Sequence, residues 1–128
     1  MYTYSNLPIY NSIFFLLKDL YERVPKFGKS YKYLLGEEML GCCIESLVLI
    51  NKISSNRNRL ERAEDLIKIE YKMNELLICL RIANELNQLS TKDNYFYLSK
   101  KVVDILNQTE NWKKFLHKEK CSQSYASA

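Results

Sequence analysis

Few residues in this chain could do chemistry, and their spacing matches no catalytic or metal-binding pattern. The sequence has one histidine, His117, and Cys121 follows it by four positions. These side chains could share one helix face, but two ligands do not make a zinc site. A di-metal carboxylate site in a helical bundle needs Glu-x-x-His motifs on two helices, and the sequence contains none. We therefore expect no metal ion and no organic cofactor.

Nucleophilic catalysis has no better support. A reactive cysteine needs a base beside it, and Cys42, Cys43 and Cys79 lie in apolar runs far along the chain from His117. Adjacent cysteines cannot readily bridge, so buried free thiols in a reducing compartment are the better interpretation. The sequence also lacks a glycine-rich phosphate loop. We expect a protein that is not an enzyme.

The carboxylates have the pattern of a solvated helix surface. Lys and Arg are interspersed with them, which is typical of exposed helix faces. We expect exposure of Glu37, Glu38, Glu61, Glu64 and Asp65.

Basic residues gather in several clusters, with tyrosines between them. Such a mixture can hold the phosphates and the bases of a nucleic acid strand. An ordinary solvated surface with half-buried tyrosines is the alternative, and Arg81 could instead pair with Glu85 as a structural residue. The candidate nucleic-acid-binding residues are Lys26, Lys29, Lys32, Arg57, Arg59, Arg62, Arg81, Lys100, Lys101, Lys113 and Lys114.

The elements that must position these residues are helices. Apolar residues make up 47% of the 128 positions, and only three glycines and two prolines interrupt them, which predicts the all-α class. The length suits one domain, placed at 1–120, with a disordered polar tail at 121–128. The net charge of +4 does not by itself indicate nucleic-acid binding. Without a bilayer-spanning run or a signal peptide, we expect a cytoplasmic protein with no membrane partner.

Periodic apolar residues and the breaks between them predict the first two helices. The first has Ser5 or Asn6 as its N-cap and ends before Pro25, because a proline pushes the preceding residue out of the helical region. The second has Ser30 as its N-cap and runs to about Ile53.

The same pattern predicts two further helices. The third runs from about Arg59 to Leu89. The fourth follows a capping-box-like spacing of Ser90 and Asp93 and reaches 112–117, with a weak point at 107–111. Short connections make neighbouring helices antiparallel, so we expect an antiparallel up-down-up-down four-helix bundle.

Two segments are apolar on nearly every side, 40–50 and 76–89. A helix in a small monomeric bundle needs only one apolar stripe, and an extra stripe needs another partner. We therefore expect a subunit interface on these helices. Gly36 and Gly41 would let another helix approach closely.

Three motifs then follow in an order that resembles one protein family. Residues 26–39 resemble the aromatic-Pro-Lys-Ser-Tyr-Arg-x-x-Leu-Gly-acidic stretch of the accessory variability determinant proteins of diversity-generating retroelements. Residues 80–90 are similar to that family's Leu-Arg-Leu-Ala-x-Asp/Glu-Leu-x-x-Leu-Ser segment, and 102–106 with Trp112 and Lys113 are similar to its closing helix. The likeness covers about Tyr10 to Lys114, nearly the whole expected fold.

The resemblance implies a role rather than a reaction. It implies a homopentameric ring of four-helix bundles with a basic outer surface, which binds the element's reverse transcriptase and its template RNA or DNA during mutagenic retrohoming. The polymerase would carry the chemistry. The alternative is the group of four-helix proteins encoded within intervening sequences of bacterial large-subunit ribosomal RNA genes, an interaction or structural module. Their Ile-Pro-x-Asn-Ile-Ala-Glu-Gly-like segment is absent here.

Overall fold

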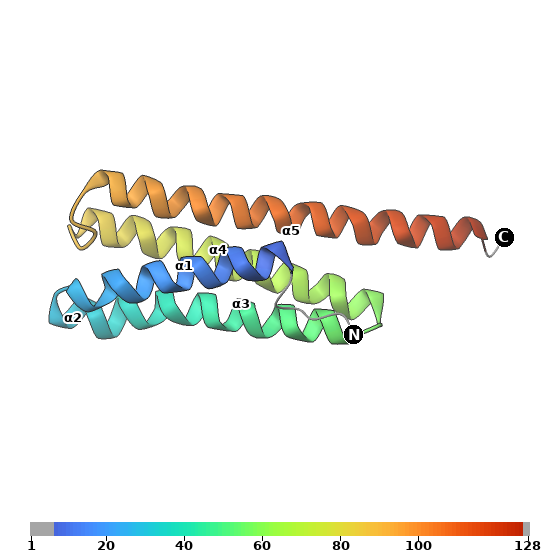
Figure 1. Cartoon of the computed structure of the whole chain (residues 1–128), viewed down its shortest axis with the longest axis horizontal. Helices are drawn as coiled ribbons and strands as arrows, with labels where there is room; N and C mark the ends of the chain where they lie inside the picture. Colours follow the sequence, from blue (N-terminus) through green and yellow to red (C-terminus); the bar gives the residue numbers. More distant parts are fainter. Residues whose placement is uncertain (1–6, 127–128) are drawn as a thin grey trace.

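The computed structural model describes the backbone of residues 7–126 and the side chains of residues 7–118, and every regular element within them is a helix (Figure 1). This confirms the all-α class. No described helix has both the length and the apolarity to cross a membrane. The elements are α1 (Pro8–Arg23), η2 (Val24–Lys26), α2 (Lys29–Tyr31), η3 (Lys32–Gly36), α3 (Glu37–Ser55), α4 (Arg59–Glu85) and α5 (Lys92–Ala126).

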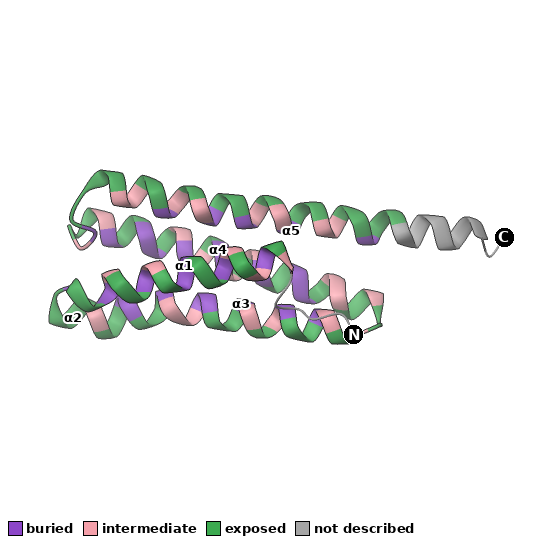
Figure 2. Ribbon diagram, viewed as in Figure 1, coloured by how far each residue is buried: buried purple, intermediate pink, exposed green. Residues whose placement is uncertain are grey.

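The long helices lie side by side around one core. α1 contacts α3 and α5, and α4 contacts the same two helices. The α1–α3 and α4–α5 connections lie at one end of the molecule, and the α3–α4 connection lies at the other (Figure 1). Buried positions line the faces that the helices turn toward each other (Figure 2). The largest fully buried side chains are Ile13, Leu16, Leu20, Met39, Ile50, Ile53, Leu66, Ile69, Met73, Leu76, Leu80 and Leu98.

The start of α1 differs from the prediction. The helix begins at Pro8, and its N-cap is Leu7, which is extended and makes no side-chain cap. The predicted caps Ser5 and Asn6 lie outside the described residues. Pro8 stands where its missing N–H needs no partner, so the helix can begin without a polar cap.

α1 ends before Pro25 as predicted, but Val24 keeps helical dihedral angles (φ −56°, ψ −41°), and the chain continues through the single 3₁₀ turn η2. Gly28, and not Ser30, is the N-cap of the following helix. The Gly28 N–H donates to Gln88 Oε1 at 2.7 Å, which ties this turn to the α4–α5 connection. The chain therefore turns two residues earlier than the serine indicated.

Gly36 closes the turn between α1 and α3. A Cβ atom added there would overlap Val24 Cγ1 of η2, so only glycine allows this approach. Gly36 is the last residue of η3, a π-helix, which inserts one extra residue into the helical repeat. The predicted close approach is thus confirmed at Gly36. It is wrong at Gly41, where an added Cβ would have no neighbour within 4 Å.

α4 begins at Arg59 as predicted, because the Asn58 side chain accepts a hydrogen bond from the Glu61 N–H at 3.1 Å. It ends at Glu85 rather than Leu89. Asn87 adopts a left-handed φ of 58°, and the Asn87 and Gln88 N–H groups bond back to Asn84 and Ala83. This is a Schellman ending with asparagine in the usual glycine position.

α5 is one uninterrupted helix. Thr91 Oγ1 accepts the Asn94 N–H at 3.2 Å, so the predicted Ser90–Asp93 box does not form. No break occurs at 107–111, where Thr109 fits into the core by bonding to the Ile105 carbonyl at 2.8 Å. The helix includes residues 121–126 of the expected disordered tail, and 127–128 lie outside the described residues. The stretch contains neither glycine nor proline to stop it.

Asp65 corrects the expectation of an exposed acidic surface. Its exposure is only 1%, in the seam between α3 and α4. Lys52 Nζ lies 3.4 Å from Oδ2, and Lys68 Nζ lies 3.6 Å from Oδ1. A carboxylate can be buried here because two lysines reach over it from the surface. Glu37, Glu38, Glu61 and Glu64 are exposed, as expected.

The Gly36 contact predicts opposite effects of alanine at two helical glycines. Gly36→Ala should lower the free energy of unfolding by about 1–3 kcal/mol, because the buried and stiff Val24 side chain cannot yield. Gly41→Ala should raise it by up to about 1 kcal/mol through helix propensity alone. Urea titration measures both. Val24→Ala should recover part of the loss in Gly36→Ala, and equal stabilities of the two glycine variants would contradict the contact.

Candidate functional site

A groove between α1 and α5 combines aromatic rings with lysines. It encloses about 450 Å³ and is lined by Ser12 and Phe15 of α1 and by Tyr97, Lys100, Lys101 and Asp104 of α5. Phe15 and Tyr97 are 55% and 45% exposed. Aromatic rings that are about half exposed can stack on flat, polarisable groups while the rest of the side chain stays packed against the protein.

Cations accompany both rings. Lys18 Nζ lies 5.7 Å from the centroid of Phe15, and Lys101 Nζ lies 4.6 Å from that of Tyr97. Arg23 of α1 also lies near the Tyr97 ring, 5.5 Å from its centroid. These distances are within the range of cation–π attraction. The groove therefore offers stacking surfaces and positive charge together.

Two of the predicted cations are already paired within the chain. Lys101 Nζ donates to Asp19 Oδ2 at 2.7 Å. Burial lowers the pKa of Lys101, but its hydrogen bonds to Asp19 and Tyr97 outweigh burial and raise the pKa above its ordinary value. Lys113 Nζ lies 2.8 Å from Glu70 Oε1, and that hydrogen bond likewise raises its pKa. We expect these two lysines to contribute less to phosphate binding than exposed ones.

Lys100 lines the groove, and two hollows at opposite ends of the molecule hold two other predicted cations. Lys26 lies in a hollow with Gln88 at the α4–α5 connection. Arg62, at the opposite end, lines a hollow with Trp112 and Phe115 of α5. The structure therefore brings the start of α4 beside the second half of α5, but not beside Lys26. Exposed residues of the predicted set are Lys26, Lys29, Arg57, Arg81, Lys100 and Lys114, and partly buried ones are Lys32, Arg59, Arg62, Lys101 and Lys113.

An uncovered apolar stripe follows the outer face of α4. Tyr71 is 72% exposed and Ile78 is 62% exposed, and Leu60, Ile67 and Ile82 continue the stripe along the helix. On α3, Ile44 and Val48 are also exposed. Both helices were predicted to be apolar on nearly every side. Part of that apolar surface is exposed, because no other described part of the chain covers it.

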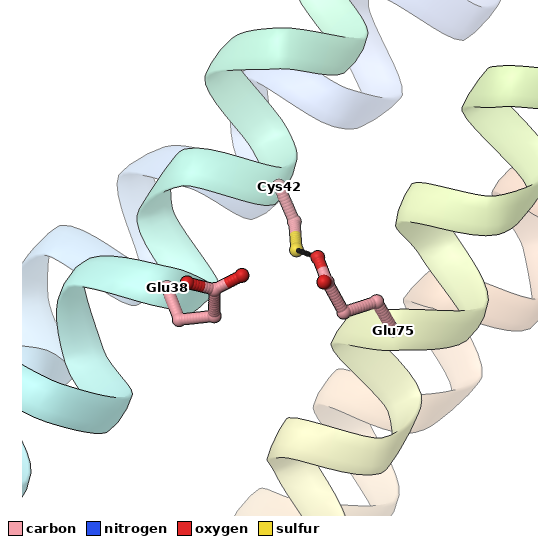
Figure 3. Close-up of side chains that lie close together, drawn as sticks. All are labelled: Glu38, Cys42 and Glu75. Atoms are coloured by element: carbon pink, nitrogen blue, oxygen red, sulfur yellow. Dashed lines mark hydrogen bonds between the residues drawn. The ribbon is translucent and has the colours of Figure 1, made fainter.

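Sequence reasoning missed a cluster of thiols and carboxylates at the α3–α4 seam. Glu38, Cys42 and Glu75 point toward one another (Figure 3), with their ligand atoms all within 4.8 Å. The Cys42 thiol donates to Glu75 Oε2 at 2.8 Å. A signal was present in the sequence, since Glu-x-x-x-Cys occurs at Glu38–Cys42 and again at Glu75–Cys79.

The three described thiols are held in the protonated form. Burial, and then the hydrogen bond to Glu75, raise the pKa of Cys42. Burial raises the pKa of Cys43 to about 12, and burial with the charges of Glu75 and Glu38 raises that of Cys79. The thiolate is the reactive form of cysteine, so these groups are poor nucleophiles. The prediction of buried free thiols is confirmed for all three.

Comparison with known proteins assigns no family: the sequence matches no protein-family model and no curated protein.

The raised cysteine pKa values predict a loss of stability at high pH. Between about pH 9 and 12 the unfolded chain releases the Cys43 proton while the folded chain keeps it. The free energy of unfolding should therefore fall with pH, by about 1.4 kcal/mol per pH unit for each such thiol. Cys43→Ala should flatten this slope in urea titrations across that window. Gly41→Ala, which keeps every thiol, should retain the wild-type slope, and equal slopes in both variants would refute the burial effect.

Proposed function

We propose that this protein is a non-catalytic accessory subunit of a diversity-generating retroelement, which binds RNA or DNA beside the element's reverse transcriptase in the cytoplasm. The observation that carries the nucleic-acid part is the groove between α1 and α5, where Phe15, Tyr97 and Lys100 are exposed together. The motif resemblance supports the rest. The reverse transcriptase would perform the copying, and this subunit would hold the strand.

The groove suits a single strand with little sequence preference. Bases would stack on Phe15 and Tyr97, because every base has an aromatic face. Phosphates would lie against Lys18 and Lys100, which are exposed. Lys101 is engaged by Asp19 and would hold the Tyr97 ring in place rather than bind the strand. Affinity would therefore combine stacking with a modest electrostatic contribution.

Assembly of several copies of this chain would enlarge the surface available for nucleic acid. We propose an antiparallel up-down-up-down bundle that forms a homopentameric ring, with the outer stripe of α4 as the main contact between subunits. Tyr71 and Ile78 are large apolar side chains exposed on one helix face, and such patches mark association surfaces. A ring would repeat each groove by symmetry, so several weak sites could engage one strand.

A protein-binding module without nucleic acid, as in the intervening-sequence group, is the second candidate. Its specific support is the internal pairing of Lys101 with Asp19 and of Lys113 with Glu70. These pairs remove two cations from the predicted footprint. Binding to single-stranded RNA separates the two candidates.

Stacking in the groove predicts a selective loss of RNA affinity. Phe15→Leu and Tyr97→Leu should each weaken binding to a single-stranded oligonucleotide by about 1–3 kcal/mol, because each removes a base-stacking ring. Lys100→Gln should reduce the salt slope by about 0.7. Fluorescence anisotropy at several salt concentrations measures both.

Phe96→Leu is the matched control for the groove variants, because Phe96 is an exposed ring on the same helix that does not line the groove. It should bind as the wild type does. Replacement of Arg57, Arg59 and Arg62 by Ala tests the arginines around the start of α4 in the same assay, where it should weaken binding to all sequences similarly and reduce the salt slope. No binding by the wild type at low salt would reject the nucleic-acid role and favour the protein-binding module.

The exposed α4 stripe predicts a homo-oligomer. Light scattering at micromolar concentration should give a multiple of the 15.2 kDa chain mass, with five chains expected. Tyr71→Lys and Ile78→Lys should yield folded monomers, because both positions face outward in the single chain. Phe115→Lys, an equally exposed change on α5, should leave the mass unchanged. A wild-type monomer would refute the interface, and a dimer or hexamer would refute the ring.

A further inference from the structure

Two Glu-x-x-x-Cys motifs face each other across the α3–α4 seam. Glu38 and Cys42 lie one turn apart on α3, and Glu75 and Cys79 lie one turn apart on α4. This spacing places both side chains of a motif on the same helix face. Three of the ligand atoms lie within 4.8 Å of one another (Figure 3). Cys79 lies outside this group of three, one helical turn from Glu75 on the same face of α4, and the charges of Glu75 and Glu38 act on its thiol.

We propose that Glu38, Cys42, Glu75 and Cys79 bind a thiophilic divalent metal ion of the Zn²⁺ class. Two sulfur and two carboxylate ligands match the donors and the coordination number that Zn²⁺ takes in proteins. Ca²⁺ and Mg²⁺ are bound by oxygen ligands and do not suit the thiols. This site uses none of the groove residues, so it does not depend on the proposed function.

For the three clustered ligands, Glu38, Cys42 and Glu75, coordination requires only side-chain adjustment. In a tetrahedral site with Zn–S of about 2.3 Å and Zn–O of about 2.0 Å, ligand atoms are about 3.4–3.8 Å apart. The atoms of Glu38, Cys42 and Glu75 span up to 4.8 Å, with the Cys42–Glu75 pair at 2.8 Å. The ion would separate that hydrogen-bonded pair and draw Glu38 inward. The flexible glutamate side chains can supply this movement while both helices stay in place.

The proposed ligands differ in exposure, with the two thiols on the core side and the two carboxylates on the surface side. Cys42 and Cys79 are 1% and 6% exposed, whereas Glu38 is exposed and Glu75 is partly exposed. An ion could therefore enter from the carboxylate side and be held by the thiols on the core side. The thiols are fixed by packing, which makes half of the site rigid before the ion arrives.

Neighbouring charge supports the same site. Two thiolates and two carboxylates would exceed the charge of one divalent ion. Lys72 Nζ lies 3.8 Å from Glu75 Oε2 and 2.6 Å from Glu45 Oε2, so a cation adjoins the site on α4. The hydrogen bond to Glu45 raises the pKa of Lys72, which keeps that cation charged. Lys72 would offset part of the surplus negative charge.

Metal binding must displace the thiol protons. A cysteine thiol carries its proton at neutral pH, because its ordinary pKa is about 8.5. A metal ion binds the thiolate, so coordination by both cysteines releases two protons for each ion bound. This stoichiometry distinguishes coordination by both thiols from adsorption of the ion on surface carboxylates.

The test is a titration of tag-free, reduced full-length protein with Zn²⁺, with Co²⁺ as the spectroscopic probe. Every sample carries Cys121→Ala, which removes the thiol that follows His117 by four positions. We expect one Zn²⁺ per chain, two protons released, and Co²⁺ absorption with thiolate charge-transfer and tetrahedral bands. Cys42→Ala, Cys79→Ala and Glu75→Gln should each lower the Zn²⁺ affinity at least about tenfold, because even outer partners of metal ligands have effects of that size.

Cys43→Ala is the matched control, because Cys43 is a fully buried thiol next to Cys42 that does not belong to the cluster. Glu64→Gln is the control for Glu75→Gln, because Glu64 is an exposed carboxylate of α4 that does not belong to the cluster. Both should keep the wild-type affinity. Glu75 is partly exposed, so its variant stays folded even if a cysteine variant does not. Absence of stoichiometric binding, release of fewer than two protons, or equal affinity in the Glu75 and Glu64 variants would overturn the proposal.

Discussion

The ion pair between the buried Asp65 and Lys52 forms in one register of the α3–α4 seam, and the cluster around Cys42 depends on the same register. Asp65 is almost fully buried, and an unpaired carboxylate in that position is strongly destabilising. Ten residues separate Cys42 from Lys52 on α3, and ten separate Asp65 from Glu75 on α4, so one antiparallel alignment creates both cross-helix pairs. A slip of one turn, about 5.4 Å, would leave Asp65 only the lysine of its own helix. The same alignment fixes which apolar side chains of α4 face the core and which face outward.

The helical architecture could be predicted from the sequence because apolar periodicity is a local property. The start of α4 was predictable for the same reason, since Asn58 caps the turn that follows it. The end of α4 was not, because Asn87 adopts a left-handed conformation that asparagine tolerates but does not require. Similarly, the contact of Gly36 with Val24 depends on how η2 folds back, although the glycine itself indicated a close approach. Boundaries that depend on one backbone conformation are thus harder to predict than helices that depend on a repeated pattern.

The candidate sites differ in the same way. The basic residues could be found from their type, but the pairing of Lys101 with Asp19 could not, because the two are 82 positions apart in the chain. The groove likewise depends on Phe15 and Tyr97 meeting across two helices that are distant in sequence. The cluster around Cys42 follows from the register, and no spacing within a single helix reveals the alignment of its neighbour. The sequence therefore identified candidate cations but not the cluster around Cys42, and packing determined which side chains are paired, buried or exposed.

The contact between α1 and α5 has a consequence for the order in which the chain folds. The other neighbouring helices are consecutive along the chain, so they can pair as soon as each one is complete, at a low cost in loop-closure entropy. The α1–α5 seam joins the first helix to the last, and α1 must wait with one side uncovered until α5 has left the ribosome. A chain still under synthesis would have the α3–α4 seam but neither Tyr97 nor the lysines of the groove. The groove between α1 and α5 would therefore form only after α5 is complete, later than the α3–α4 seam.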